Sequence, residues 1–297
     1  MYSAKNKYHI IIMIFIFDSY GGLCNQILDI NCALDFSMKN NLEFSFRHCS
    51  FRLDDINLFN NHIEFENLFN KKHFTEYKNY VPFENIKKKM HKNNTINYNS
   101  IVINKWCKND KELINMVKLI PKNTQKQFII IKQFFCIYNF TNIKQNFYHI
   151  ISPCEKIYNI CTLIINNLLP SKFNFIHYRY EEDFTTFFNI SNIRSIDYLL
   201  DNIHFKNNKL KIYIACSNLK ELSNTKYLHK HVDEYKNIII KDNFLKKYNL
   251  HLLNFEQKAF VDYIIGQKSE EMYGYNKSSF SKLLNFTKHT NNYYNDL

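Results

Sequence analysis

The sequence predicts an α/β fold made of two Rossmann-like halves that meet at a cleft. Apolar runs of strand length, rich in Ile, Phe and Tyr, alternate with longer amphipathic stretches, which is typical of βαβ units around a parallel sheet. The 297 residues exceed the usual domain size of roughly 100 to 200 residues, so two domains are expected. With 45% hydrophobic and 16% aromatic residues, each half has enough apolar surface for a core.

The first domain is expected to span residues 1–170. An apolar run at residues 10–17 predicts a strand, residues 25–39 a helix and residues 42–46 a second strand. A polar middle region follows, in which residues 128–131 and 134–138 look extended. Residues 155–169 then predict a helix that ends near Pro170, the expected domain boundary.

The second domain, residues 171–297, begins a new βαβ series. The expected strands cover residues 173–178, 210–216 and 237–240, and the expected helices cover residues 195–203, 218–230, 254–267 and 279–284. Ligands of such sheets bind outside the carboxyl ends of the strands, so motifs that follow a strand are the candidates for a site.

Charge and cysteine content narrow the function classes. The net charge of +12 suggests a nucleic-acid or membrane-surface binder, but the excess is mostly Lys and is spread along the chain. Nucleic-acid readers usually favour Arg with stacking aromatics, so the dense cluster at residues 87–92 is expected to be a solvated helix face or loop, and no nucleic-acid partner is expected. The eight cysteines include no C-x-x-C pair, which indicates a reduced chain without a zinc site.

The apolar run at residues 10–17 also bears on localisation. It could pass for the core of a signal peptide, but no small-residue cleavage site follows, and the run is far shorter than the roughly 20 residues that span a bilayer. We therefore expect a cytoplasmic protein without stable membrane insertion, with the lumen of the secretory pathway as the alternative.

The four glycines mark the first candidate site. Gly21 and Gly22 follow the first expected strand and precede a helix, where a tight turn presents free N–H groups at the helix N-terminus. This arrangement predicts an anion or sugar site. An ordinary strand-to-helix turn is the alternative.

The second candidate site is a segment at the end of the first strand of the second half. His177 and Arg179 alternate along the strand and should project the same way, so that Arg179 can bind two oxygens of a diphosphate and His177 can add a further donor. A structural ion pair of Arg179 with Glu181 or Asp183 is the alternative, and Glu181 to Asp183 could also form a D-x-D-like metal site.

The third candidate site lies near the C-terminus. The pattern of helix, short strand, loop and helix places Ser278 and Ser279 at a helix N-terminus, where hydroxyls and N–H groups either cap the helix or bind phosphate. Gly274 marks the loop as tight, and the short strand is expected to end on the same sheet edge as Arg179. Phosphate binding is therefore favoured.

Together these segments resemble the GDP-fucose O-fucosyltransferase family, in motif order and rough spacing. The family carries a GGLxNQ-like loop, an HLRxExD segment and a DxxI…SSF segment. The matching positions are Gly22, Leu23, Asn25, Gln26, His177, Arg179, Glu181, Asp183, Asp262, Ser278, Ser279 and Phe280. Residues from about 50 to 165 show no resemblance, and Cys24 stands where the family usually has Gly or a small polar residue.

The resemblance implies a GT-B-like fold, with an acceptor-side first domain and a donor-binding second domain. It also implies GDP-fucose as the donor, inversion at the anomeric carbon and no obligatory metal or cofactor. Arg179 and Asn25 would be the catalytic residues, Arg179 holding the diphosphate and Asn25 lying against the fucose and acceptor. Asp262 would contact the nucleoside and residues 278–280 the phosphates, with Gly22, Leu23 and His177 completing the donor site.

The acceptor, a protein hydroxyl or a glycan, is left open. Glycan-directed α-1,2/α-1,6-fucosyltransferases carry similar motifs, but their arginine segment usually reads HxRRGD, and Tyr180–Glu181 replaces Arg-Gly here. A non-catalytic protein that binds sugar nucleotides or nucleic acid is a further alternative. The catalytic base is not identified, although Asp18 is a candidate.

Overall fold

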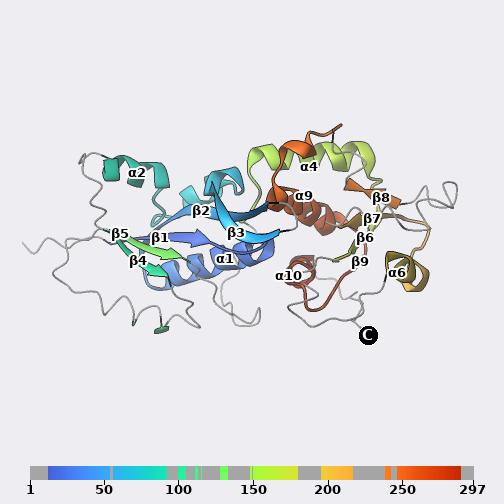
Figure 1. Ribbon diagram of the computed structural model, residues 1–297, viewed down its shortest axis with the longest axis horizontal. Helices are drawn as coiled ribbons and strands as arrows, with labels where there is room; N and C mark the ends of the chain where they lie inside the picture. Colours follow the sequence, from blue (N-terminus) through green and yellow to red (C-terminus); the bar gives the residue numbers. More distant parts are fainter. Residues whose placement is uncertain are drawn as a thin grey trace, which may run out of the picture. The chain divides into compact units, whose positions relative to one another are not determined.

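The computed structural model confirms the α/β class, with two β-sheets and flanking helices (Figure 1). The structure describes residues 13–53, 56–91, 100–104, 111–112, 115, 128–132, 148, 150–179, 195–216, 238–241 and 246–288. Within these ranges, no helix is both long and apolar enough to cross a membrane.

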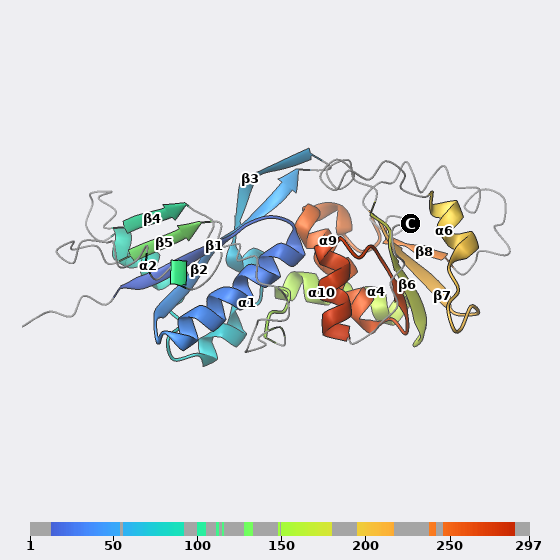
Figure 2. The ribbon, with the colours of Figure 1, turned by 90° about the horizontal axis from the view of Figure 1, so that it is seen from below.

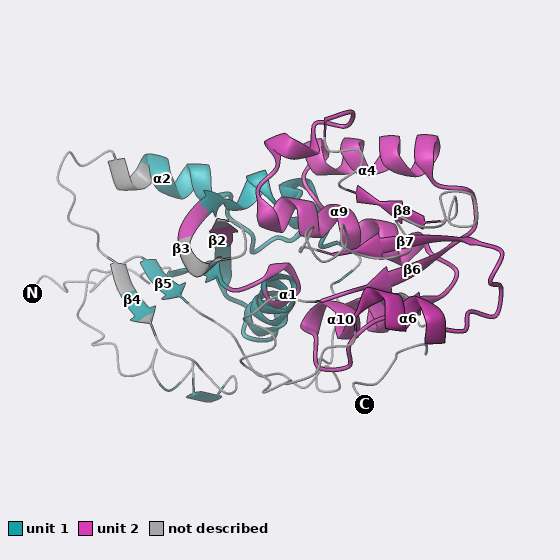
Figure 3. Ribbon diagram, turned by 45° about the vertical axis from the view of Figure 1, so that its right-hand side comes forward, with its two compact units in different colours: residues 1–20, 26–50, 63–152 teal, residues 21–25, 51–62, 153–297 magenta. Residues whose placement is uncertain are grey.

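The chain forms two compact units (Figure 3). The first contains residues 1–20, 26–50 and 63–152, and the second contains residues 21–25, 51–62 and 153–297. From the sequence, the domain boundary was predicted at Pro170, which assigned residues 21–25 and 51–62 to the first domain. In the structure, the segments 21–25 and 51–62 group with the C-terminal part of the chain.

The first sheet has five strands in the order β3-β2-β1-β5-β4. Their bounds are β1 Ile14–Ser19, β2 Glu43–Leu53, β3 Ile56–Glu64, β4 Ser100–Asn104 and β5 Phe128–Lys132. The central strand β1 runs parallel to both neighbours, with Ile14 opposite Glu43 and Phe128. Helix α1, Leu23–Lys39, lies along this sheet (Figure 2), and Phe36 packs edge-on against Phe15 of β1.

Edge strands are where the sequence prediction was weakest. Strands β3 and β4 were not predicted, and β2 continues to Leu53 instead of ending at residue 46. Both missed strands lie at the edges of the sheet, each with one neighbouring strand among the described residues, and Val102 of β4 is half exposed.

The second sheet has four parallel strands in the order β8-β7-β6-β9. Their bounds are β6 Phe173–His177, β7 Lys211–Ala215, β8 Ile238–Ile240 and β9 Met272–Tyr273. Among the described residues, the α-helices of this unit are α4 Glu155–Leu168, α6 Ile196–Asn202, α9 Phe255–Lys268 and α10 Ser279–Lys288.

The two faces of this sheet have different cores because side chains alternate along each strand. Ile176 and Ile214 pack with Ile196 of α6 in one buried cluster. On the opposite face, the rings of Phe175 and Tyr213 stack with centroids 5.8 Å apart. A Cβ on Gly266 of α9 would come within 3.1 Å of the Phe175 ring, so this glycine allows α9 to pack closely on that face.

Most predicted elements are confirmed. The run at residues 10–17 corresponds to β1, and the predicted strands at 128–131, 173–178, 210–216 and 237–240 correspond to β5 to β8. The predicted helices at 25–39, 155–169, 195–203, 254–267 and 279–284 correspond to α1, α4, α6, α9 and α10. Residues 10–12, 134–138 and 218–230 lie outside the described residues.

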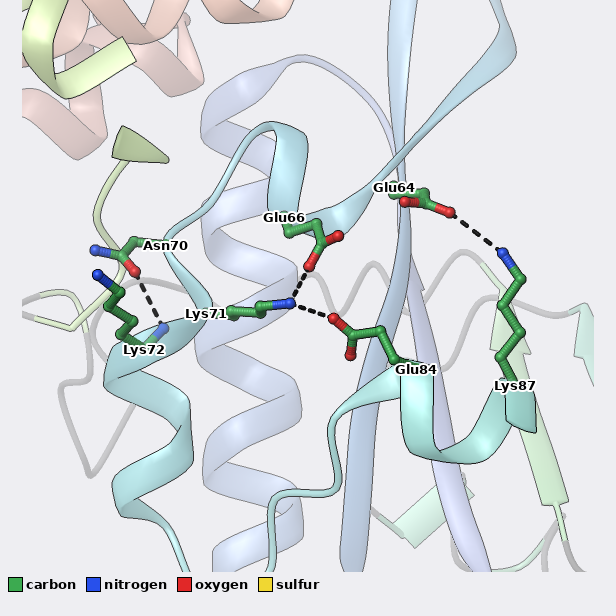
Figure 4. A network of polar contacts seen from close by, with 7 residues as sticks. All are labelled: Glu64, Glu66, Asn70, Lys71, Lys72, Glu84 and Lys87. Atoms are coloured by element: carbon green, nitrogen blue, oxygen red, sulfur yellow. Dashed lines mark hydrogen bonds and ion pairs between the residues drawn. The ribbon is translucent and has the colours of Figure 1, made fainter. Parts of the chain in front are cut away.

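The basic cluster at residues 87–92 begins on helix α2, Phe83–His91, where Lys87 and Lys88 are exposed as expected. Figure 4 shows the surrounding ion pairs: Lys71 contacts Glu66 and Glu84, and Lys87 Nζ lies 3.5 Å from Glu64 Oε1. Exposed pairs of this kind contribute about 0 to 1 kcal/mol each to stability. The network thus belongs to a solvated face of the protein.

Candidate functional site

Two chain segments leave the second sheet at the same edge. Strands β6 and β9 run parallel, with Ile176 opposite Tyr273, so the residues that follow His177 and those that follow Tyr273 emerge side by side. The expectation that the short C-terminal strand ends on the edge that carries Arg179 is therefore confirmed. This edge is where ligands of parallel α/β sheets bind.

His177 is buried at this edge and is held by two residues of α10. Its Nδ1 atom lies 2.7 Å from the Ser281 hydroxyl oxygen, and its ring stacks on Phe280 with centroids 4.3 Å apart. Burial, and next the nearby Arg179 guanidinium, lower the pKa of His177 to about 3. The imidazole is therefore neutral at physiological pH and carries one N–H.

Gly274 allows this contact. A Cβ at this position would lie 2.4 Å from Ser281 Oγ and 3.0 Å from Ser281 Cβ, so a larger residue would push α10 away from His177. The sequence analysis recognised the tight loop but missed Ser281. The position of Ser281 could have indicated its role, because it follows Ser278 by three residues and so faces the same way on the helix.

Ser278 precedes the first residue of α10 and has an unusual environment. Its carbonyl accepts the Lys282 N–H at 3.0 Å, which places it at the N-cap position. An N-cap hydroxyl normally accepts an N–H of the first turn, yet the buried Ser278 Oγ has no hydrogen-bond partner in the described part of the chain. This helix terminus is therefore not capped by its own serine.

Arg179 follows β6 by two residues and is half-buried. Burial, and next the Glu256 carboxylate, raise the pKa of the Cys24 thiol. The Arg179 guanidinium lies close enough to this thiol to lower its pKa. Arg179 and the segment around Cys24 are thus neighbours within the second unit. Glu181 and Asp183, the alternative ion-pair partners and metal ligands, lie outside the described residues.

The Gly21–Gly22 turn precedes α1. Gly21 has φ +88°, a left-handed conformation that favours glycine, which confirms the need for this residue. The Asn25 side chain folds back against it, since a Cβ on Gly21 would lie 3.1 Å from Asn25 Nδ2. The turn is closed by the Asn25 N–H, which donates to the Gly22 carbonyl at 2.9 Å.

The expectation that this turn presents free N–H groups is wrong for Leu23. Its N–H donates to Glu256 Oε2 at 2.7 Å, and Arg52 Nε donates to the other oxygen, Oε1, at 2.8 Å. Glu256 and Arg52 were not predicted, because 233 residues separate Leu23 from Glu256 and an acidic residue in a first helical turn is common. An internal carboxylate thus occupies the position that an anion was expected to take.

Asp262 of α9 lies in a second buried network. Its Oδ1 accepts the Tyr213 hydroxyl at 2.8 Å, and its Oδ2 forms an ion pair with Lys241. These contacts fix α9 against β7 and the end of β8. The contact of Asp262 with a nucleoside stays a prediction.

Asp18, the candidate base, lies in the first unit at the end of β1. Arg47 donates to both of its oxygens, from Nε to Oδ1 at 2.9 Å and from Nη2 to Oδ2. Asp18 is thus the partner of an arginine within the first unit. Its role as the base stays a prediction.

The fold is similar to that of solved fucosyltransferases. A crystal structure of POFUT1 in complex with GDP matches with a TM-score of 0.59 and 9% identity, over 96% of this chain and 98% of that chain. A POFUT1 complex with GDP-fucose gives 0.56 and 9%, over 94% and 95%. NodZ, an alpha-1,6-fucosyltransferase soaked with GDP-fucose, gives 0.53 and 7%, over 93% and 92%.

These similarities establish the α/β fold of the GT-B-like fucosyltransferase structures. No protein-family model matches the chain, and no curated protein matches it in sequence.

Proposed function

We propose that this chain is a fucosyltransferase that takes GDP-fucose as its donor and binds the diphosphate at the carboxyl edge of β6 and β9. The observation that carries the proposal is the N-terminus of α10, where Ser278 presents a buried hydroxyl without a partner in the described chain. The fold supports it, because the similar POFUT1 and NodZ structures were solved with GDP or GDP-fucose.

The diphosphate would be bound by three kinds of donor. Arg179 can donate two parallel hydrogen bonds to phosphate oxygens, and the first N–H groups of α10, at Ser279 and Phe280, lie at the positive end of the helix dipole. With Ser281 donating to Nδ1, the neutral His177 imidazole would add the N–H of Nε2. Because His177 is bonded to Ser281 and Ser278 stands at the N-cap of α10, these two residues are held in place before the ligand binds.

The proposed reaction is an inverting displacement. The acceptor oxygen attacks the anomeric carbon, the bond from that carbon to the β-phosphate oxygen breaks with its electron pair, and the acceptor proton passes to a base. Negative charge builds on the departing GDP, where a fixed cation such as Arg179 contributes on the order of 3 kcal/mol to the transition state. With this cation in place the reaction would need no metal ion. Asn25, with Gly22 and Leu23, would lie against the sugar.

The acceptor is proposed to be a hydroxyl of a protein side chain. The Tyr180–Glu181 pair supports this choice, because glycan-directed enzymes usually have Arg-Gly there. The second candidate is a glycan acceptor, which the similarity to the alpha-1,6-fucosyltransferase NodZ favours. Parallel transfer assays with folded protein domains and with free glycans would separate the two.

The direct test is hydrolysis and transfer of GDP-fucose, measured with and without EDTA. We expect release of GDP in both conditions. Loss of turnover with EDTA, restored by a divalent cation, would contradict metal independence. Failure to turn over GDP-fucose under any condition would contradict the transferase function.

A non-catalytic binding protein would behave differently in a thermal unfolding experiment. We expect GDP to raise the melting temperature more than ADP, UDP or duplex DNA does, because ligands that bind only the folded state stabilise it. If DNA stabilises the chain and GDP does not, the basic surface binds nucleic acid and the proposal fails.

A further inference from the structure

Glu256 is a fully buried carboxylate in the first turn of α9, at 0% exposure. Helix α9 does not need it as a cap, because Asn254 and Gln257 form a complete capping box at this terminus. Both Glu256 oxygens instead bind groups from distant parts of the sequence, Leu23 N–H and Arg52 Nε. The buried Glu256 carboxylate therefore holds the segments that it contacts in place.

Arg52 completes the arrangement. Its guanidinium carbon lies 3.9 Å from the centre of the Phe255 ring, and its Nη2 lies 3.6 Å from the place where a Cβ on Gly22 would stand. The Gly22–Leu23 backbone is thus held between Arg52 and Glu256. These contacts explain why residues 21–25 and 51–62 belong to the second compact unit.

Fold stability alone is a weak reason for such a pair. The cost of removing two charges from water usually offsets their attraction, and well-packed apolar residues in the same place are often equally or more stabilising. A buried pair does, however, specify one position of the groups that it binds. Here that group is the first N–H of α1, two residues before Asn25.

The held segment lies next to the proposed donor site. Cys24 is buried, and burial is the main cause of the raised pKa of its thiol. Glu256 raises this pKa further and Arg179 lowers it, so both charged groups lie near Cys24. Asn25 follows Cys24 directly, and its side chain is packed against Gly21. A shift of Leu23 would therefore move Asn25 relative to Arg179.

We propose that Glu256 is a positioning residue: by binding the Leu23 N–H it holds the turn of residues 21–25 so that Asn25 is correctly placed against the donor sugar. This inference rests on the proposed function, because it assigns Asn25 to the sugar. It predicts that Glu256 affects turnover and leaves the binding of GDP itself, at the α10 terminus, nearly unchanged.

Two double variants separate positioning from stability. Arg52→Met/Glu256→Leu removes the charged pair and the acceptor for Leu23 N–H, whereas Arg52→Met/Glu256→Gln removes the charges but keeps an amide oxygen for that N–H. Circular dichroism and thermal unfolding would confirm that both are folded. GDP affinity would be measured by calorimetry, and kcat and KM with GDP-fucose.

We expect both variants to bind GDP within about threefold of the wild type. The Leu variant should lose about 100-fold in kcat, the effect of misplacing a group by about 1 Å, while the Gln variant should stay within about tenfold of the wild type. Equal kcat values for the two folded variants would overturn the inference.

If either double variant does not fold, the single variants Glu256→Leu and Glu256→Gln give the same comparison: kcat should fall with Leu and stay within about tenfold of the wild type with Gln, and GDP affinity should be kept in both. A loss of GDP affinity as large as the loss of kcat would overturn the inference. The wild-type assay separates the two proposals: an inactive wild type contradicts the proposed function, whereas an active wild type with unaffected variants contradicts only the role of Glu256.

Discussion

The second unit contains two glycine turns that each lead into a helix, and the two helix N-termini are satisfied in different ways. At α1, Glu256 accepts the Leu23 N–H. At α10, the Ser278 hydroxyl is buried without a partner in the described chain, and Arg179 and His177 lie at the same sheet edge. One terminus is bound by the protein itself, and the other is suited to an external anion.

The comparison shows that a glycine turn before a helix does not by itself identify a phosphate site. Both turns contain glycine and connect a strand to a helix, and ligand binding was predicted for both from the sequence. What separates them is a single carboxylate from a distant helix.

Arg179→Lys should reduce turnover of GDP-fucose by at least about 100-fold, or roughly 3 kcal/mol of transition-state stabilisation, because Lys keeps the charge but cannot donate two parallel hydrogen bonds. Steady-state kinetics would measure it. Near-normal activity would show that the diphosphate binds elsewhere. It would contradict the proposed anion site at the N-terminus of α10.

Gly274→Ala and Gly22→Ala compare the two turns directly. The added methyl at Gly274 would stand 2.4 Å from Ser281 Oγ, whereas at Gly22 the nearest atom, Arg52 Nη2, is 3.6 Å away. We expect Gly274→Ala to destabilise the fold by about 2 kcal/mol and Gly22→Ala by less than about 0.5 kcal/mol in urea unfolding. Equal effects would contradict the close approach of α10 to Gly274.

Acidification should weaken the region around α10 through His177. Because its folded pKa of about 3 lies below the ordinary value of 6.5, the unfolded chain binds more protons between these values, and stability is lost as pH falls through this window. Between pH 6.5 and 5.5 the wild type should lose about 1 kcal/mol more than His177→Asn. The free energies of unfolding of the two proteins, measured across this pH range, test this prediction. Equal losses in both would show that His177 is not buried in its neutral form.

Ser278→Ala should have the smallest effect on the fold. Without ligand, its stability should stay within about 0.5 kcal/mol of the wild type, since the hydroxyl makes no hydrogen bond in the described chain. Its affinity for GDP should fall at least about tenfold, because a hydrogen bond to a charged group contributes roughly 1.5 to 3 kcal/mol. Lower stability with unchanged GDP affinity would instead indicate an ordinary helix cap.

The sequence predicted the elements whose apolar pattern is strong. The strands β1, β6 and β7 are buried runs, and α9 and α10 have clear starts, so these elements were located within a few residues. The edge strand β3 was missed because polar residues interrupt its apolar pattern, and the edge strand β4 was missed because its apolar run is only three residues long, between Ser100 and Asn104.

The candidate site was predictable only as a set of local motifs. The positions of His177, Arg179 and Ser278 relative to strands and helices follow from periodicity and turn residues. The contacts that define their chemistry, such as Ser281 on His177 and Glu256 on Leu23, join residues 104 and 233 positions apart. No local pattern carries such pairings, because they arise from the packing of whole elements.

The most direct test of the account is GDP binding, measured by calorimetry on the wild type, Ser278→Ala and Arg52→Met/Glu256→Leu. The account predicts that the wild type and the double variant bind GDP within about threefold of each other, while Ser278→Ala binds at least about tenfold more weakly than the wild type. The opposite pattern, with GDP affinity lost in the double variant and kept in Ser278→Ala, would place the anion at α1 and contradict the account.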